Sequence, residues 1–445
     1  MLTLEELLAR PFAILGYGSE GRALAQLIRQ LAPTVPLTVF AEQAPDDAQP
    51  LQPGQDQLHV GPLDAAVLRN YSVLVKSPGI SRYHPALAAL PETILQTSTT
   101  NLWFAEHGGE RCLCITGTKG KSTTAALTAH LLSQAGRTVT LAGNIGAPLI
   151  EQWPSQSDWQ VIELSSYQTA DLDAHPEVGV LLSLYPEHLD WHGGESQYYA
   201  DKCRLLTQAD HAWAPPALRP RLAAMDDRYQ GLNWLDSQPP LRLAEHAIHS
   251  GDQALMPIAD LPLRGRHNAS NVIAAWELAR YAGIDDETIM AALPSFQPLA
   301  HRLCDIGQAQ GLRFIDDSIS TTPHAAIAAL AAYADCQPLT ILVGGHDRGL
   351  SWQIFADHLN QQPTHAVITM GANGARIHQL LRDNAIHLPG GIHNCASLDE
   401  AVATARRITP AGGTVLLSPG APSYGEFKNY VQRGRHFAGI ALRGG

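Results

Sequence analysis

The 445-residue sequence lacks the features of a membrane protein or a general nucleic-acid binder. No stretch approaches the roughly 18 consecutive apolar residues of a membrane-spanning helix, so we expect no membrane span. Positive charge is in deficit, because 30 Lys and Arg residues stand against 42 Asp and Glu, a formal net charge of −12. That balance argues against broad binding to nucleic acid or to anionic membranes, although a local phosphate site remains possible.

Cysteine is also scarce. The six cysteines show no disulfide or zinc spacing, and Cys112 and Cys114 fall in an apolar, strand-like run where packing is the expected role. Residues 1–6 lack the basic region and apolar core of a signal peptide. Repeats, charge runs and low-complexity tracts are absent as well. These features predict a cytoplasmic globular protein, and the length predicts two to four domains.

The most informative stretch is residues 112–124, in which a short apolar run leads through a glycine and threonine turn into a helix. Backbone N–H groups and a helix N-terminus hold phosphates in this setting. Lys121 would reach the outer phosphates and Ser122 would bind Mg²⁺. The usual P-loop has a further glycine where this chain has Ile115, so the motif is a shortened Gly-Thr-x-Gly-Lys-Ser. We interpret it as an ATP site.

The N-terminal region has the pattern of a dinucleotide-type turn, since apolar residues 11–15 lead into Gly-Tyr-Gly-Ser-Glu-Gly at 16–21. The acid that normally ends the second strand comes one place late, at Glu42. A further apolar strand, 71–75, ends in a loop at 77–80. Ligands of open α/β sheets bind at such strand ends. These residues alone leave open whether the ligand is NAD or another phosphorylated molecule.

In the middle region, the buried strand predicted at 159–163 ends in Glu163, and an acid at a strand end beside a P-loop is the normal second holder of Mg²⁺. The next strand, 178–184, leads into a block that contains His188, and the following helix carries Lys202. Taken singly, His188 is more often structural and Lys202 more often solvated. We expect residues 215–240 to form an irregular segment at the periphery of the domain. We also expect a helix at 272–282 that is capped by residues 264–271.

The last third alternates strands and helices, with strands predicted at 313–315, 340–343, 366–369 and 414–417. This pattern predicts a second, smaller Rossmann-like sheet after a linker near Pro294 and Pro298. The fold class is therefore α/β in three domains. They are a Rossmann-like domain at 1–107, a central P-loop ATPase domain with a parallel sheet at 108–297, and a C-terminal Rossmann-like domain at 298–445.

Four motifs taken together resemble the Mur ligase family over essentially the whole length. They are Gly117-Thr118-x-Gly120-Lys121-Ser122, Glu163-Leu164-Ser165-Ser166, Gly265-x-His267-Asn268-x-x-Asn271 and His301-Arg302. Within that family, the length and the N-terminal turn are similar to those of ligases that add glutamate to UDP-N-acetylmuramoyl-L-alanine in peptidoglycan synthesis. The resemblance implies ATP-dependent amide formation through an acyl phosphate, by a cytoplasmic monomer with small-molecule substrates. It also implies that the N-terminal turn binds UDP and no NAD.

The resemblance implies a role for each matching position. The UDP substrate would contact Gly18, Ser19, Glu20, Ser77, Asn144, Ser165 and Gln168. ATP would contact Gly117, Thr118, Lys119, Gly120, Lys121, Ser122, Thr123, Asn268, Asn271, Arg302 and Asp317. Two Mg²⁺ ions would be held by Ser122, Glu163, His188 and a CO₂-derived carbamate on Lys202, and glutamate by Thr321, Arg348, Ser423 and Tyr430. Lys121, His188 and Lys202 would be catalytic, and the C-terminal domain would close during the reaction.

The departures from the family pattern cluster in three segments, at 319–323, at Arg348 and at 418–425, while Lys119 replaces a common asparagine. The three segments surround the amino-acid site in the family. Because arginine does not replace lysine neutrally in binding carboxylates, the cluster favours a branch that adds L-glutamate and leaves inversion to a separate epimerase. The alternatives are drift within an ordinary D-glutamate ligase, folylpolyglutamate synthase, a catalytically silent nucleotide-binding protein, and a hydride-transferring Rossmann enzyme.

Overall fold

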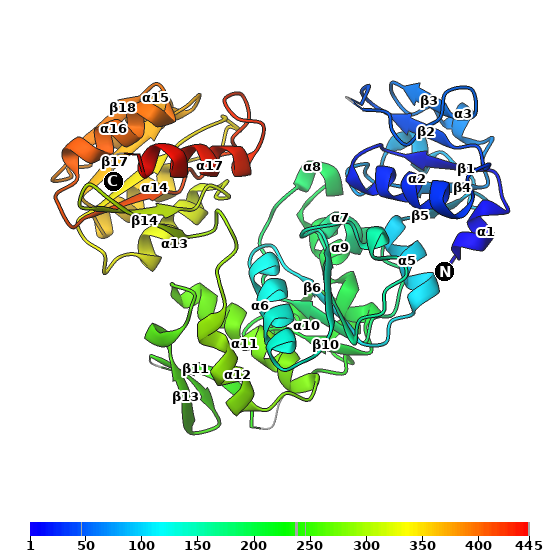
Figure 1. Ribbon diagram of the computed structural model, residues 1–445, viewed down its shortest axis with the longest axis horizontal. Coiled ribbons are helices and arrows are strands. Elements are labelled where there is room, and N and C mark those ends of the chain that lie inside the picture. Colours follow the sequence, from blue (N-terminus) through cyan, green and yellow to red (C-terminus); the bar gives the residue numbers. More distant parts are fainter. Residues whose placement is uncertain (46, 236–238, 245, 444–445) are drawn as a thin grey trace. The chain divides into compact units, whose positions relative to one another are not determined.

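The structure is a computed structural model that describes residues 1–45, 47–235, 239–244 and 246–443 (Figure 1). The chain forms two compact units, one of residues 1–256 with 270–294 and the other of 257–269 with 295–445. The first unit contains two parallel sheets and the second contains one mostly parallel sheet. The predicted α/β class with several parallel sheets is confirmed, whereas the three domain boundaries stay predictions.

The N-terminal sheet is parallel, in the order β3-β2-β1-β4-β5. Its strands are β1 (Phe12–Leu15), β2 (Thr38–Ala41), β3 (Gln57–Val60), β4 (Val73–Lys76) and β5 (Leu95–Thr97), with helices α1 (Leu4–Leu8), α2 (Ser19–Leu31), α3 (Ala65–Leu68) and α4 (Pro85–Ala88). The tight turn from β1 into α2 requires glycine at position 21, because a Cβ there would lie 2.1 Å from the Gly16 carbonyl oxygen. The glycine pattern therefore brings the start of α2 against the end of β1.

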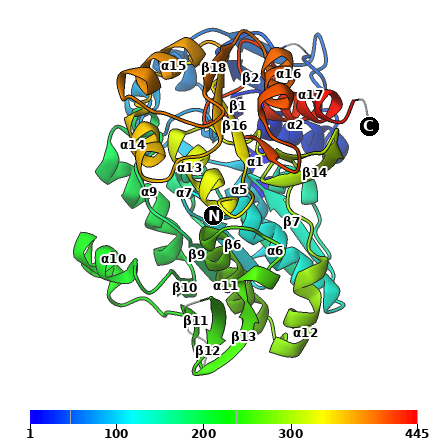
Figure 2. The same cartoon turned by 90° about the vertical axis from the view of Figure 1, so that its left-hand side faces the viewer.

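The central sheet is also parallel, in the order β10-β9-β6-β8-β7. Its strands are β6 (Cys112–Thr116), β7 (Val139–Gly143), β8 (Trp159–Glu163), β9 (Val178–Leu181) and β10 (His211–Trp213). The accompanying helices are α5 (Thr99–His107), α6 (Lys121–Gln134), α7 (Ser166–Asp171), α8 (Leu189–His192) and α9 (Glu195–Gln208). Figure 2 shows β6 and β9 between α6 and α9. Cys112 and Cys114 are buried in β6 and unbridged, as expected.

A small three-stranded sheet, β11 (Leu241–Ala244), β12 (Ala247–Ser250) and β13 (Gln253–Pro257), precedes α11 (Arg266–Tyr281) and α12 (Asp286–Ala292). Two sequence expectations are wrong here. The region 215–240 contains a helix, α10 (Arg219–Met225), because Pro220 is tolerated in the first helical turn. The segment 264–271 does not cap a helix at 272, since α11 already begins at Arg266.

The C-terminal sheet has the order β14-β15-β19-β16-β17-β18. Its strands are β14 (Cys304–Ala309), β15 (Leu312–Asp316), β16 (Leu339–Val343), β17 (Ala366–Met370), β18 (Ile392–Cys395) and β19 (Thr414–Leu417), and its helices are α13 (Pro323–Ala332), α14 (Gln353–Gln361), α15 (Gly374–Asp383), α16 (Leu398–Ile408) and α17 (Tyr430–Ala441). The expectation of a smaller sheet is wrong, because this sheet has six strands and each of the other two parallel sheets has five. The edge strands β14 and β18 were not predicted, since their residues are only partly buried and only partly apolar.

None of the described helices is both long enough and apolar enough to cross a membrane.

Candidate active site

The P-loop lies between the buried strand β6 and the long helix α6. Gly120 has a φ of 91° and directly precedes the first helical residue, Lys121. A Cβ at Gly120 would lie 2.4 Å from Oδ1 of Asn271 on α11, and the positive φ further favours glycine there. The predicted partners Gly120, Lys121 and Asn271 are therefore close together. The free N–H groups and dipole of α6 point at this loop, which is a favourable place for phosphate.

Two side chains of the loop region are occupied by contacts within the protein. Nζ of Lys121 donates to the carbonyl oxygens of Gly117, at 3.0 Å, and Thr118, at 3.3 Å. Nζ of Lys119 lies 2.8 Å from Oε1 of Glu187. Burial alone would raise the pKa of Glu187, but Lys119, followed by His188 and Lys121, holds that pKa below its usual range. Glu187, which was not predicted as a site residue, pairs with the lysine that stands where asparagine is common.

Glu163, at the end of β8, is completely buried and has one unused oxygen. Its Oε1 accepts a 2.6 Å hydrogen bond from Nδ2 of Asn144, while its Oε2 has no hydrogen-bond partner among the described residues. A buried carboxylate oxygen without a partner is costly unless it binds a ligand. Its position therefore fits a divalent cation.

The other predicted metal ligands give a partial set. Among the described residues, no group of three or more His, Cys, Asp and Glu side chains could hold a metal ion. Mg²⁺ usually keeps several waters and phosphate oxygens and needs only one or two protein carboxylates. Ser122, Glu163, His188 and a modified Lys202 thus remain a chemically reasonable but incomplete donor set, which ATP would complete.

Lys202 projects from α9 into the interior beneath the P-loop. It is 2% exposed, and its Nζ donates to the Gly117 carbonyl oxygen at 3.1 Å. Burial, followed by the nearby Lys121, holds the pKa of Lys202 well below its usual range. Tyr198, one turn earlier on α9, makes a 2.8 Å hydrogen bond with Thr118 Oγ1. One face of α9 therefore supports the P-loop and presents an amine that is readily deprotonated.

His188 lies at the turn into the short helix α8. Its φ is 56°, and its side chain remains 38% exposed. Its Nε2 is 4.0 Å from Oε2 of Glu187, and its ring centroid is 5.1 Å from that of Tyr167. The structure thus places His188 beside the carboxylate that binds Lys119, with room for its ring to reach a ligand.

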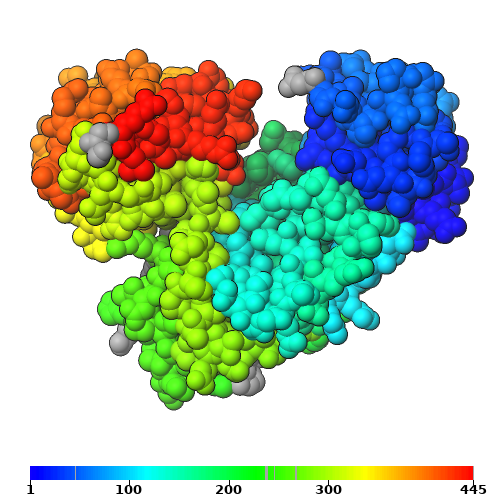
Figure 3. Space-filling model, viewed as in Figure 1, coloured from blue at the N-terminus to red at the C-terminus, as the bar shows by residue number. Residues whose placement is uncertain are grey.

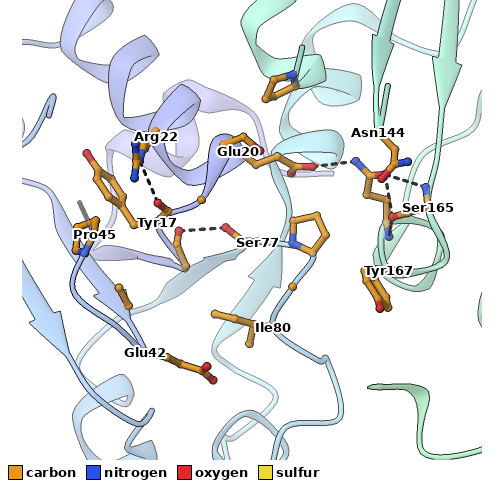
Figure 4. Close-up of a pocket in the computed structure, with 18 of the residues that line it drawn as sticks. Tyr17, Glu20, Arg22, Glu42, Pro45, Ser77, Ile80, Asn144, Ser165 and Tyr167 are labelled. Carbon is orange, nitrogen blue, oxygen red and sulfur yellow. Dashed lines mark hydrogen bonds between the residues drawn. The ribbon is translucent and has the colours of Figure 1, made fainter. Parts of the chain in front are cut away.

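A cavity of about 610 Å³ lies between the N-terminal and central sheets of the first unit (Figure 4). Figure 3 shows the surface of that unit, in which the N-terminal segment (blue) meets the central one (cyan). A cavity of this size suits a cofactor-sized ligand. All seven predicted UDP-substrate residues line it: Gly18, Ser19, Glu20, Ser77, Asn144, Ser165 and Gln168. Polar residues that the sequence did not assign also line it, namely Tyr17, Arg22, Glu42, Gln43 and Tyr167.

One hydrogen bond, between Gln168 and Glu20, joins the two walls of the cavity, and further bonds hold side chains within each wall. Oε1 of Glu20 accepts from Nε2 of Gln168 at 2.8 Å, and Oε2 accepts from the Thr99 hydroxyl. Burial raises the pKa of Glu20 above its ordinary value. Gln168 Oε1 in turn accepts from the backbone N–H of Ser165 at 2.9 Å. On the other wall, Ser77 Oγ donates to the Gly16 carbonyl oxygen at 3.1 Å.

Seven predicted residues belong to the second unit: Asn268, Arg302, Asp317, Thr321, Arg348, Ser423 and Tyr430. Asp317 is buried and accepts from the hydroxyl of Ser418 at 2.7 Å, and burial raises its pKa to about 7. Arg302 has a buried Nε without a partner in the described chain. Arg348 and Tyr430 are exposed, whereas Ser423 is buried.

Asn268 is held on α11 by a 2.7 Å bond from its Nδ2 to the Arg264 carbonyl oxygen, and it falls in the second unit while Asn271 falls in the first. The motif residue His267 lies outside the residues whose side chains are described. Sequence reasoning missed Arg433, a buried arginine that donates to the carbonyl oxygens of Ser318 and Ala421. Burial lowers the pKa of Arg433 to about 10.

Comparison with known proteins gives matches over most of the chain. The Mur ligase middle domain matches residues 115–213, and the Mur ligase glutamate ligase domain matches 301–420. A UDP-N-acetylmuramoyl-L-alanine–L-glutamate ligase of Xanthomonas euvesicatoria pv. vesicatoria is 42% identical, over 99% of this chain and 97% of its own. Among solved structures, MurF from Acinetobacter baumannii has a TM-score of 0.61 at 15% identity, over 97% of this chain and 90% of its own. The alanine ligase MurC from Thermotoga maritima has a TM-score of 0.58 at 17% identity, over 97% and 98%.

The fold and the phosphate loop define a multidomain α/β ligase that uses ATP. Because the Xanthomonas euvesicatoria relative is 42% identical over 99% of the chain, the chain belongs to the Mur ligase family.

Proposed function

We propose that the protein joins L-glutamate to UDP-N-acetylmuramoyl-L-alanine at the expense of ATP, a step of peptidoglycan synthesis and hence of cell-wall formation, cell shape and division. The observation that carries this proposal is the 2.6 Å hydrogen bond between Asn144 and Glu163. Asn144 lines the cavity and Glu163 ends a strand beside the P-loop strand β6. A muramoyl carboxylate in the cavity and the phosphates of ATP would therefore meet at one pair of side chains. The name of the relatives supplies the substrates.

Negative charge sets the main requirement of the reaction, because the substrate carboxylate and the γ-phosphate repel each other. Lys121 would release its loop carbonyls to bind phosphate, and the N-terminus of α6 would stabilise the same charge. Bound Mg²⁺ would neutralise phosphate charge and fix its orientation. Ser122, the unused oxygen of Glu163 and His188 are the residues that would hold it, and two ions are expected.

Lys202 would supply the remaining anionic ligand. Burial lowers the pKa of its amine, which favours the neutral form that attacks CO₂. The attack forms an N–C bond and releases a proton, which leaves a carbamate with one negative charge where a cation stood. The cations at Lys121 and the expected metal would stabilise that charge.

The chemistry then proceeds in two steps. The muramoyl carboxylate attacks the γ-phosphorus and ADP leaves, giving an acyl phosphate. The neutral amine of glutamate attacks the acyl carbon, the C–O bond to phosphate breaks, and the amine loses a proton to the departing phosphate as the amide forms. A charged ammonium cannot attack, so the amine must be deprotonated first. The carboxylates of glutamate would be held by Arg348, Thr321, Ser423 and Tyr430, which leaves the amine free to reach the acyl carbon.

The choice of L-glutamate rests on the altered amino-acid segments together with the relatives, which bear the L-glutamate name. The exposed Arg348 has a longer, bidentate reach than lysine. With an L-product, a separate epimerase would act later in the pathway. The protein is further proposed to act as a cytoplasmic monomer.

The test is an ATP-dependent ligation assay with UDP-N-acetylmuramoyl-L-alanine and each glutamate enantiomer in turn. We expect ADP release and product with L-glutamate at a kcat/KM at least ten-fold above that for D-glutamate. A preference for D-glutamate would show instead that the protein is an ordinary D-glutamate ligase. Nucleotide binding without ADP release would identify a silent binding protein.

A further inference from the structure

A polar cluster outside the predicted site connects α9 with residues near the cavity; Ser166, His192 and Asp201 are buried in it, whereas Tyr83 and Gln197 are exposed. It consists of Tyr83, Ser166, His192, Gln197 and Asp201 and is called the Asp201 network below. Oδ1 of Asp201 accepts from the Tyr83 hydroxyl at 2.7 Å and from Nε2 of Gln197 at 2.9 Å. Oδ2 lies 2.6 Å from Nδ1 of His192, whose Nε2 lies 3.0 Å from the Ser166 hydroxyl.

The hydrogen bonds of the network indicate which of its atoms carry protons. Two donors converge on Oδ1 of Asp201, which is the arrangement of an ionised carboxylate. His192 Nδ1 therefore carries the proton of that contact. Asp201, His192 and Ser166 are 5%, 1% and 4% exposed, so water competes little and the charge-assisted bonds are strong. A Ser–His–Asp series is also the geometry of a hydrolase, but Ser166 does not line the cavity, although its neighbours Ser165 and Tyr167 do.

On one side, the network reaches the loop that forms a cavity wall. Tyr83 follows residues 77–80, which line the cavity after β4. The same loop contacts the residue beside His192, because Trp191 Nε1 donates to the Gly79 carbonyl oxygen at 3.2 Å. The Ser81 hydroxyl donates to the Trp191 carbonyl oxygen at 2.7 Å. Movement of this loop would therefore displace α8.

On the other side, the network reaches the groups proposed for ligation. Asp201 precedes Lys202 on α9, and Tyr198, three residues before Asp201, binds the P-loop residue Thr118 at 2.8 Å. His192 ends the short helix α8, and His188 directly precedes that helix. A shift of Asp201 or His192 would therefore displace Lys202, His188 or both.

We propose that Asp201 and His192 are positioning residues that link occupancy of the sugar-nucleotide cavity to the placement of Lys202 and His188. The inference rests on the proposed function for the identity of the ligands. A buried polar cluster is not required for stability, since apolar residues of similar volume often serve as well. It does impose a particular geometry, because the buried members Ser166, His192 and Asp201 must keep their partners to avoid a buried unsatisfied group.

The test compares Tyr83→Phe and Asp201→Asn with a matched control. Tyr281→Phe removes the same kind of contact, a 2.8 Å hydrogen bond from a tyrosine hydroxyl to Glu177, from a surface pocket whose lining shares no residue with the cavity. Calorimetry would give the affinity for UDP-N-acetylmuramoyl-L-alanine with and without AMP-PNP and Mg²⁺. The ratio of the two dissociation constants is the coupling factor. Steady-state kcat and KM complete the comparison.

We expect both network variants to bring the coupling factor close to one and to lower kcat at least ten-fold. Their affinity for the sugar nucleotide without AMP-PNP should stay within two-fold of wild type, and Tyr281→Phe should match wild type throughout. Unchanged coupling and kcat, an equal loss in the control, or a loss confined to sugar-nucleotide affinity would each overturn the proposal. Coupled binding without ligation in the wild type would overturn only the proposed function, whereas no sugar-nucleotide binding at all would overturn both.

Discussion

Replacing Glu163 with glutamine tests the metal role with little change of shape. Glutamine keeps an oxygen for the 2.6 Å bond from Asn144 and puts an amide nitrogen where Oε2 now has no partner. The variant loses a charge-assisted hydrogen bond of about 1.5–3 kcal/mol and regains a neutral one of about 0.5–1.5 kcal/mol. It also removes the cost of a buried charge, which is several kcal/mol, but leaves the buried amide nitrogen without a partner, which costs about 1–3 kcal/mol. The free energy of unfolding should therefore stay constant or rise by about 1 kcal/mol.

Activity should move in the opposite direction. Loss of a metal ligand and of its charge removes about 3–5 kcal/mol of transition-state stabilisation, which is a fall in kcat of about 10²–10⁴-fold. The assay is ligation rate against Mg²⁺ concentration, with thermal unfolding alongside. Glu177→Gln is the control, because Glu177 also accepts hydrogen bonds, from Arg111 N and Tyr281 Oη, and faces another pocket. A fully active Glu163→Gln enzyme, or an equal loss in the control, would refute the metal role of Glu163.

Three further predictions concern single residues. Gly120→Ala should weaken ATP binding at least ten-fold and destabilise the fold by about 1–2 kcal/mol, because its Cβ would meet Asn271 Oδ1 at 2.4 Å and its φ is 91°; wild-type nucleotide affinity would contradict this. Lys202→Ala should lower kcat at least 10²-fold, with partial rescue by added short carboxylic acids, and ¹³CO₂ should give a carbamate signal in wild type that the variant lacks; full activity would remove Lys202 from the site. Asp317 has a folded pKa of about 7, raised by burial above 3.8, so the native state binds more protons than the unfolded state and stability should fall as pH rises from about 4 to 7, by at most about 4 kcal/mol. Asp317→Asn should flatten that part of the stability curve in denaturant titrations, and an equal slope in variant and wild type would show that Asp317 does not cause it.

The sequence alone determined the features that depend on neighbouring residues. The strand–turn–helix patterns at 112–124 and 11–28 correspond to β6 with α6 and to β1 with α2. Glu163 was expected at a strand end and ends β8. These features are local, since backbone conformation at a glycine turn and burial along a short strand follow from the residue types present. The family motifs added the lining of the cavity, where all seven proposed contacts lie.

Only the tertiary structure decided which distant side chains meet. The Lys119–Glu187 pair joins residues 68 positions apart, and the Tyr83–Asp201 bond joins residues 118 apart. No local pattern marks such partners, because each residue alone is an ordinary polar side chain. The buried Arg433 and the partly polar edge strands β14 and β18 were missed for the same reason. Burial and partner choice arise when elements pack together, so the charges that tune this site became visible only in the folded chain.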